Sequence, residues 1–362
     1  MKSPIRILQL VPSINNTSGV FNVVFNWHKH IDTAKIQFDY LYFIKESSTG
    51  REKDITKLGG KCFFLSYKNP FKFILNLMKI FKENRYAILH SHIIQLPFII
   101  FPMAKMYGVK SIIQHAHSTQ WSDKKMRSIR NYLMLHTVWP LITQRLACST
   151  EAGKFFFKKD FIVINNGIDI EKFTYNLTRR IQKRKELDVV NNFVIGHVGH
   201  LSSEKNHIFL LQIFEEIIKR NSTAKLILVG NGPLEEKLKQ TAKEKGIYDN
   251  VSFLGPRLDV PDLLQAFDVF VLPSLFEGLG IVAIEAQASG LPCVLANTLP
   301  SEALICNYKK LPLTDIQHWI NEIMQYQNNF ERKDTTFTIT NSGFSAKDVA
   351  KKIQNFYLEL EM

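Results

Sequence analysis

The sequence lacks several features that would assign it to common functional classes. Its four cysteines, Cys62, Cys148, Cys293 and Cys306, are far apart and form no Cys-x-x-Cys pair. This spacing argues against a disulfide framework and favours a reducing compartment. No histidines or cysteines have the spacing of a zinc site, so we expect no bound metal. The N-terminal apolar stretch is too short, and its flanks too polar, for a signal peptide.

Long apolar runs are also missing. The most apolar stretch, 93–104, is interrupted by Gln95 and two prolines and is much shorter than a membrane span. We therefore expect a cytoplasmic protein without a transmembrane helix. No Gly-x-Gly-x-x-Gly follows the first predicted strand, which argues against a nicotinamide dehydrogenase.

The charge of the chain is unevenly distributed. At 362 residues the chain is long enough for two domains. Residues 1–180 contain 27 Lys and Arg against 11 Asp and Glu, whereas 181–362 contain 19 against 22. This asymmetry indicates that the first half faces an anionic partner, for which nucleic acid and an anionic membrane surface both qualify.

Short apolar strands alternate with helix-length segments in both halves. In the first half we predict strands at 5–11, 38–44, 61–66, 86–92, 109–117 and 145–149, with helices such as 69–83 and 123–143. In the second half we predict strands at 193–201, 224–230, 251–255, 269–274 and 292–297, separated by helices. The pattern predicts two doubly wound α/β domains with parallel sheets, which bind ligands at the carboxyl ends of their strands. Segment 345–362 predicts a final helix capped by Ser345.

The stretch 272–292 carries two glutamates, Glu277 before a predicted helix and Glu285 within it. The turn at Gly278 and Gly280 presents free backbone N–H groups at a helix N-terminus, which is a favourable anion site. Glu277 could instead cap the helix, and Glu285 could be solvated. The apolar neighbours of Glu285 disfavour a solvated position, and ribose hydroxyls would provide the partners that a half-buried carboxylate needs.

Residues after three other predicted strands suit the same ligand. Lys205 could neutralise a phosphate, and the backbone near Arg257 could pair with a base edge. The residues at these three strand ends are Gly199, His200 and Lys205, then Gly230, Asn231 and Gly232, then Arg257, Leu258 and Asp259.

Taken together, these segments resemble the donor-binding half of retaining GT-B glycosyltransferases of glycosyltransferase family 4. The matching stretches are 196–206, 226–238, 251–264 and 272–292, and the match continues at 147–157 and 163–169. Within this family the chain is similar to enzymes that build capsular or exopolysaccharide repeat units. The resemblance implies two Rossmann-like domains facing a cleft. These would be an acceptor-binding domain at 1–170, a nucleotide-sugar domain at 171–345, and a C-terminal helix at 346–362 that crosses back to the first.

The resemblance also implies residue roles. Glu277 would hold hydroxyls of the donor sugar, Glu285 the ribose, and Lys205 a phosphate. The amides of Gly278, Leu279 and Gly280 would meet the distal phosphate, and the remaining nucleotide-sugar contacts would come from Gly230, Asn231, Gly232, Arg257 and Leu258.

The chain departs from the family pattern at two of these positions. His200 stands where the family usually has arginine, and Gly19 is the one glycine of a loop that usually has a Gly-Gly pair. The family also has a histidine near the reacting carbon. His115 and His117 are the candidates, and we favour His117, although a histidine at a strand end is often structural.

The implied reaction transfers a hexose or N-acetylhexosamine from a nucleoside diphosphate sugar, with UDP favoured, to a polyprenyl-diphosphate-linked saccharide, with retention. No Asp-x-Asp occurs, so we expect no metal clamp and no cofactor, and the diphosphate is stabilised by Lys205, His200, Gly19 and the helix at Gly280. A GT-B nucleotide-sugar epimerase and a basic nucleic-acid-binding protein are the alternatives. The second has the charge but no known recognition motif, so we expect no nucleic-acid partner.

Two basic segments of the first half, 68–83 and 121–130, mix apolar residues with lysine and arginine. They could hold the enzyme on an anionic membrane surface, where the lipid acceptor resides. Alternatively, they are helices that cover the sheet and carry their basic residues on the solvent-exposed face. We expect a peripheral location on the inner face of the plasma membrane.

Overall fold

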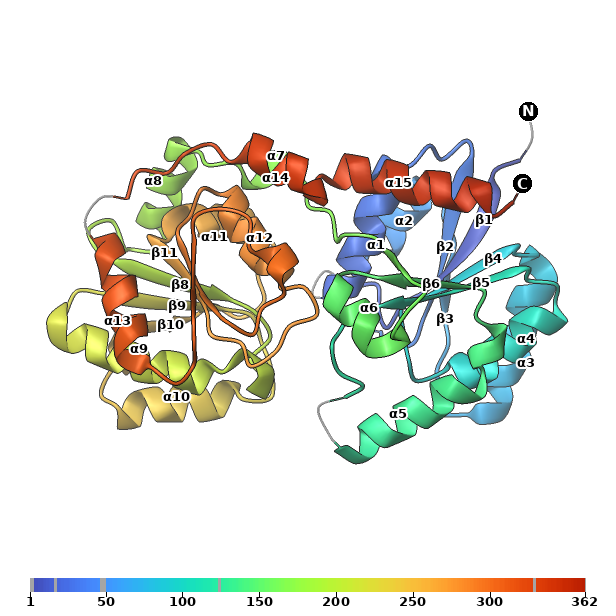
Figure 1. The fold of residues 1–362 in the computed structure, drawn as a ribbon, viewed down its shortest axis with the longest axis horizontal. Helices are drawn as coiled ribbons and strands as arrows, with labels where there is room; N and C mark the ends of the chain where they lie inside the picture. The colour runs from blue at the N-terminus through green and yellow to red at the C-terminus, as the bar shows by residue number, and fades with distance from the viewer. Residues whose placement is uncertain (1–2, 16–17, 46–49, 123–124, 328–329, 362) are drawn as a thin grey trace. The chain divides into compact units, whose positions relative to one another are not determined.

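The computed structural model describes residues 3–15, 18–45, 50–122, 125–327 and 330–361, and the chain forms two compact α/β units (Figure 1). The first unit comprises Met1–Ile168 and Gly343–Met362, and the second comprises Asp169–Ser342. The C-terminal segment therefore belongs to the same unit as the N-terminus.

The first unit is built on a parallel sheet in the order β3-β2-β1-β4-β5-β6-β7. Its strands within the described residues are β1 Ile5–Leu10, β2 Ile36–Tyr42, β3 Cys62–Phe64, β4 Ile88–Ser91, β5 Ser111–Ala116, β6 Gln144–Ala147 and β7 Ile162–Val163. All residues of β2, β4 and β5 are buried, as expected for a sheet covered on both faces. The strand order reverses between β1 and β4, which is where open α/β sheets bind ligands.

The helices of the first unit begin at recognisable signals. Asn69 caps α3, its side chain accepting a hydrogen bond from the Lys72 amide at 3.0 Å, and Pro70 follows at the first helical position. Ser345 caps α15 as predicted. The helices are α1 Gly19–His30, α2 Glu52–Lys57, α3 Pro70–Asn84, α4 Pro97–Met106, α5 Lys125–Thr137, α6 Thr150–Phe157 and α15 Ala346–Glu359.

Helix α15 packs against α1 within the first unit (Figure 1). Its buried face includes Val349, Ile353 and Tyr357, which join the hydrophobic core that contains Trp27. This amphipathic spacing was readable from the sequence, and it explains why the last helix returns to this unit. The expectation that the C-terminal helix packs on the N-terminal domain is confirmed.

The second unit repeats the architecture in the order β10-β9-β8-β11-β12-β13. Its strands are β8 Val194–Val198, β9 Lys225–Val229, β10 Val251–Phe253, β11 Val269–Leu272, β12 Cys293–Ala296 and β13 Tyr308–Leu311. Its helices are α7 Ile170–Phe173, α8 Leu177–Glu186, α9 His207–Arg220, α10 Glu235–Glu244, α11 Val260–Ala266, α12 Ile281–Ala288, α13 Ile316–Met324 and α14 Thr336–Ile339. The order reverses between β8 and β11.

The predicted α/β class is therefore confirmed, with differences at element ends. Strands β7 and β13 were not predicted, because β7 has two residues and β13 is exposed at three of its four positions. The helix predicted at 123–143 ends at Thr137, shortly before Pro140, which cannot donate a helical hydrogen bond; residues 123–124 lie outside the described residues. Within the described residues, no helix has the length and apolarity needed to cross a bilayer.

Candidate functional site

In the second unit, two charged side chains meet where the strand order reverses. Lys205 ends a short 3-10 helix, Ser203–Lys205, that follows β8, and Glu277 lies in the loop after β11. Lys205 Nζ lies 2.5 Å from Glu277 Oε1, and the Ser274 hydroxyl donates to the same oxygen at 2.7 Å. Both charged side chains are largely buried, with exposed fractions of 15% and 10%. The pair thus forms a preorganised polar centre at the carboxyl edge of the sheet.

Two glycines shape the backbone around this centre. Gly230 has φ 131°, and a β-carbon there would lie 2.0 Å from the carbonyl oxygen of Gly199, so only glycine fits between the loops after β8 and β9. Gly280 is the N-cap of α12 with φ 79° in the left-handed region. The sharp turn allows α12 to begin at Ile281 with its first amides at the same strand edge as Glu277.

Glu285 lies on α12 among apolar neighbours. Its carboxylate makes no hydrogen bond to the described residues, and burial raises its pKa to about 8. At neutral pH the side chain is therefore mostly protonated and can donate a hydrogen bond as well as accept one. A vicinal diol such as that of ribose offers hydroxyls that suit both functions.

The side chain of Arg257 is held by acidic residues of the second unit. Its guanidinium forms two hydrogen bonds with Asp259, at 2.7 and 2.6 Å, and contacts Glu186 at 3.5 Å. Lys183 of α8 also binds Asp259 at 2.8 Å. Hydrogen bonds, first from Arg257 and then from Lys183, hold the pKa of Asp259 well below its usual range. The Arg257 side chain therefore ties the loop after β10 to α8.

The remaining predicted residues of this unit lie at the same strand edge, with different exposure. His200 and Asn231 are exposed, and Leu258 is 71% exposed, whereas Leu279 is buried. The Asn231 carbonyl accepts from the Leu201 amide at 2.8 Å, and this hydrogen bond links the loops after β8 and β9. In the first unit, Gly19 opens α1, and a β-carbon there would meet nothing within 4 Å.

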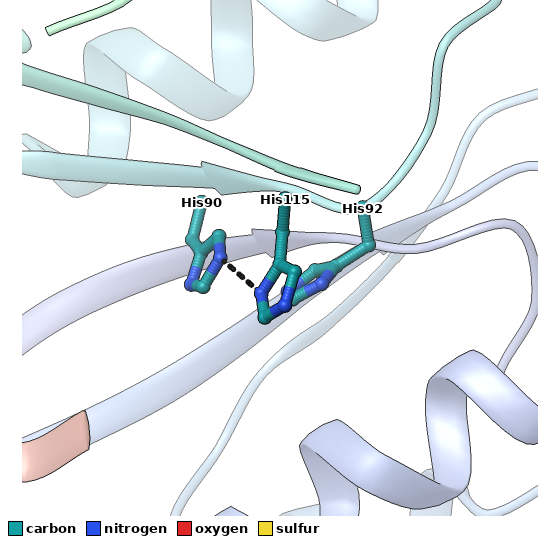
Figure 2. Close-up of side chains that lie close together, drawn as sticks. All are labelled: His90, His92 and His115. Atoms are coloured by element: carbon teal, nitrogen blue, oxygen red, sulfur yellow. Dashed lines mark hydrogen bonds between the residues drawn. The ribbon is translucent and has the colours of Figure 1, made fainter. Parts of the chain in front are cut away.

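A cluster of histidines lies at the corresponding edge of the first sheet. His90 and His92 come from the end of β4, and His115 and His117 from the end of the neighbouring β5 (Figure 2 labels the first three). Nitrogen atoms of His90, His92 and His115 all lie within 4.8 Å of one another. Trp27 of α1 stacks on His90 and His115, with ring centroids 6.0 and 5.8 Å away.

This cluster corrects the expectation that no histidines have metal-ligand spacing. The prediction considered spacing along the sequence, whereas the pairing of β4 with β5 brings two His-x-His segments side by side. Burial lowers the pKa of every member, to about 3 for His117 and well below the ordinary histidine value for His90, His92 and His115. All four imidazoles are therefore neutral at physiological pH.

Sequence reasoning missed three polar residues at these two centres. Ser274 holds Glu277, whereas Gln9 of β1 and Tyr357 of α15 bind histidines of the cluster. Gln9 lies in a buried strand and Tyr357 on the buried face of its helix, and a polar group at a buried position was the available signal.

A cavity of about 660 Å³ in the second unit lies away from these residues. Phe193 and Asp268, which precede β8 and β11, line it, so it opens at the amino ends of the strands. Its arginines already have partners: Arg180 and Arg184 bind Asp268, and Arg332 binds a carbonyl of α11. Because doubly wound sheets bind ligands at the carboxyl ends, this cavity is the weaker candidate.

Comparisons with known proteins agree with this architecture. The family model described as "Glycosyl transferases group 1" matches residues 178–333. The chain is 32% identical over 308 residues to the putative glycosyltransferase EpsF of Bacillus subtilis (strain 168), covering 81% of this chain and 79% of that protein. It is 29% identical over 350 residues to the UDP-Gal:alpha-D-GlcNAc-diphosphoundecaprenol alpha-1,3-galactosyltransferase of Escherichia coli, covering 90% of each.

A solved structure with the same fold is that of Anabaena HepE in complex with UDP and glucose. It matches with a TM-score of 0.81 and 19% identity, covering 98% of this chain and all of that one. At this identity the likeness concerns the fold, and it confirms a pair of Rossmann-like domains. The residue roles stay predictions.

Proposed function

The chain belongs to the group 1 glycosyl transferases, and we propose that it extends a lipid-linked saccharide during the synthesis of a surface polysaccharide. The donor would be a nucleoside diphosphate sugar, with UDP as the nucleotide, and the transferred group a hexose or N-acetylhexosamine. The acceptor would be a saccharide on a polyprenyl diphosphate. The name of the Escherichia coli relative describes such a pair of substrates.

The observation that carries the proposal is the contact between Lys205 and Glu277. A nucleoside diphosphate sugar carries phosphates and sugar hydroxyls close together, and it needs a cation beside a hydrogen-bond acceptor. Lys205 and Glu277 supply these groups 2.5 Å apart, at the strand edge where doubly wound sheets bind nucleotides. The first amides of α12 add positive partial charge to the same edge.

Within this site we assign the following roles. Lys205 and the amides at 278–280 bind the diphosphate, Glu277 binds hydroxyls of the donor sugar, and Glu285 binds the ribose. His200 and Gly19 add contacts to the phosphates. Two loops flank the nucleotide, one containing Gly230, Asn231 and Gly232 and the other containing Arg257 and Leu258. The backbone at Arg257 and Leu258, rather than the guanidinium, faces the base.

We further propose that transfer needs no divalent metal and retains the anomeric configuration. Fixed donors aimed at the leaving diphosphate would stabilise the charge that develops there, as a metal does in other enzymes. His117 would lie beside the reacting carbon. Its neutrality, caused by burial, suits hydrogen bonding to a hydroxyl rather than binding to an anion.

Helices α3 and α5 support an acceptor carried by a membrane. Each exposes apolar side chains among basic ones, and α4 contacts both helices. The exposed apolar residues are Phe71, Ile74, Leu75 and Met78 of α3, and Met126, Ile129, Tyr132 and Leu133 of α5. Sheet-covering helices need only one apolar face, so these extra apolar groups, beside exposed Lys72 and Lys79, favour adsorption to an anionic bilayer.

The test is transfer from a panel of UDP- and GDP-sugars to a lipid-diphosphate saccharide, with the product mass as readout. We expect one donor to add one sugar to the acceptor, with equal rates in EDTA and in magnesium. Glu277→Gln is the matched control, since it removes the carboxylate charge with little change in shape. Dependence on a divalent ion, or conversion of the donor to an epimer without acceptor, would contradict the proposal.

A further inference from the structure

The histidine cluster of the first unit is a hydrogen-bonded network with two branches that meet at Gln9. This residue lies on β1 in register with His90 on β4, at the reversal point of the sheet. Its side chain is completely buried. The Gln9 amide oxygen accepts from one histidine, and its nitrogen donates to Tyr357.

The first branch runs from Gln9 to His117. The Gln9 oxygen can only accept, so His92 must carry its proton on Nε2, which lies 2.9 Å away. His92 is neutral, and its Nδ1 must therefore accept. Nε2 of His117, at 2.8 Å, is the donor to that nitrogen. The Nδ1 of His117 is then left with a lone pair.

The second branch runs from Gln9 to His115. The Gln9 nitrogen donates to the Tyr357 hydroxyl at 3.1 Å, and His90 Nδ1 lies 2.6 Å from the same hydroxyl. We assign the hydroxyl proton to this second hydrogen bond, because the hydroxyl donor is then satisfied. His90 therefore carries its proton on Nε2, which lies 3.2 Å from Nδ1 of His115, as the dashed line in Figure 2 shows. His115 is left with a proton on Nε2.

The ends of the two branches have no partner. Nδ1 of His117 and Nε2 of His115 are buried and make no hydrogen bond within the described part of the chain. Given these proton positions, Nδ1 of His117 is an acceptor and Nε2 of His115 is a donor. The two rings are stacked, with centroids 4.2 Å apart. Buried polar atoms without partners are costly, and in native proteins they call for a specific explanation.

We propose that Gln9 and Tyr357 are positioning residues that fix all four histidines as Nε2–H tautomers, so that His117 presents an acceptor and His115 a donor to a substrate hydroxyl. A hydroxyl group can donate to the first nitrogen and accept from the second. The wrong tautomer would reverse both atoms and present a donor where an acceptor is needed. This role rests on the proposed sugar transfer, whereas the tautomers themselves do not.

The tautomers can be read directly by NMR of protein labelled with ¹⁵N at histidine, since protonated and unprotonated ring nitrogens have distinct shifts. At neutral pH we expect Nε2–H for His90, His92, His115 and His117. Tyr357→Phe removes the second branch, so His90 and His115 should become tautomer mixtures while the other two stay unchanged. Gln9→Met removes the common anchor, so all four should become mixtures.

Tyr40→Phe is the matched control. It removes an equally buried hydrogen bond, 3.2 Å long, between a tyrosine hydroxyl and Nδ1 of His28 in the same unit. It should leave the four tautomers and the transfer rate unchanged. In Tyr357→Phe we expect kcat to fall by up to about 100-fold, the scale of a misplaced reacting group, with KM for the donor unchanged.

Three results would overturn the inference. The first is Nδ1–H tautomers in the wild type, and the second is a Tyr357→Phe effect that does not separate the two branches. The third is stoichiometric zinc or nickel in the purified protein, bound through His90 and His92, because metal ligation would replace their hydrogen bonds to His115 and His117. If the tautomers are as stated but no sugar is transferred, the proposed function fails and the network stands.

Discussion

The ammonium group of Lys205 lies 2.5 Å from a carboxylate oxygen of Glu277. The group proposed to bind the diphosphate of the donor is therefore paired with the group proposed to bind its sugar hydroxyls. Lys205 follows β8 and Glu277 follows β11, the two strands that flank the reversal in strand order. A diphosphate that binds Lys205 therefore competes with Glu277, while Ser274 continues to orient the carboxylate.

Substitutions of this pair should separate nucleotide binding from sugar transfer. Lys205→Gln should weaken UDP binding by about 10- to 100-fold, the scale of a lost hydrogen bond to a charged group. Glu277→Gln should bind UDP as well as the wild type or better, because the competitor of the phosphate is gone, yet transfer no sugar. Calorimetry with UDP and a coupled transfer assay would measure both. Equal losses of UDP affinity in the two variants would argue against separate roles.

Glu285 should make stability depend on pH. Burial raises its pKa from 4.5 to about 8 in the folded protein, so its contribution to stability is complete below pH 4.5 and disappears as the pH rises through 8. The loss approaches about 1.4 kcal/mol per pH unit in this window. Glu285→Gln should remove that loss. The thermal unfolding midpoint of the variant should therefore rise relative to that of the wild type as the pH increases from about 5 to about 8. Parallel curves for the two proteins would mean that the carboxyl is ionised in the fold.

The buried histidines should make the protein sensitive to acid. Burial lowers the pKa of His28 to about 4 and that of His117 to about 3. Their stabilising contribution is present above 6.5, the ordinary histidine pKa, and is lost as the pH falls toward the folded values. Each such group costs up to about 1.4 kcal/mol per pH unit. His28→Gln should flatten the acid side of the thermal midpoint profile, and a profile identical to the wild type would refute this cause.

Charge reversal on α3 should release the protein from anionic vesicles. Lys72→Glu with Lys79→Glu should lower binding to phosphatidylglycerol vesicles tenfold or more, since each basic residue near such a surface contributes about 1 kcal/mol. Lys237→Glu with Lys310→Glu makes the same change in net charge at exposed lysines of the second unit and should have little effect. Vesicle sedimentation measures both. Equal losses in the two variants would point to net charge rather than to this helix.

Local patterns in the sequence were sufficient to predict much of the fold. Apolar strands alternating with helices indicate a covered parallel sheet wherever they occur, and Ser345 marks the start of α15 through its own hydrogen bond. The glycine turn before α12 was equally readable, because the left-handed conformation of Gly280 is a local requirement. These features depend on neighbours in the chain, so one sequence was enough to identify them.

Tertiary structure alone decided which side chains meet. The pairing of β4 with β5 placed two His-x-His segments together, and the docking of α15 brought the Tyr357 hydroxyl to His90 across 267 positions of sequence. Likewise, the contacts of the Arg257 guanidinium with Asp259 and Glu186 could be seen only in the structure. Residue type and spacing determine the elements and their exposed chemistry. Which strand ends share an edge depends on long-range packing, which periodicity does not encode.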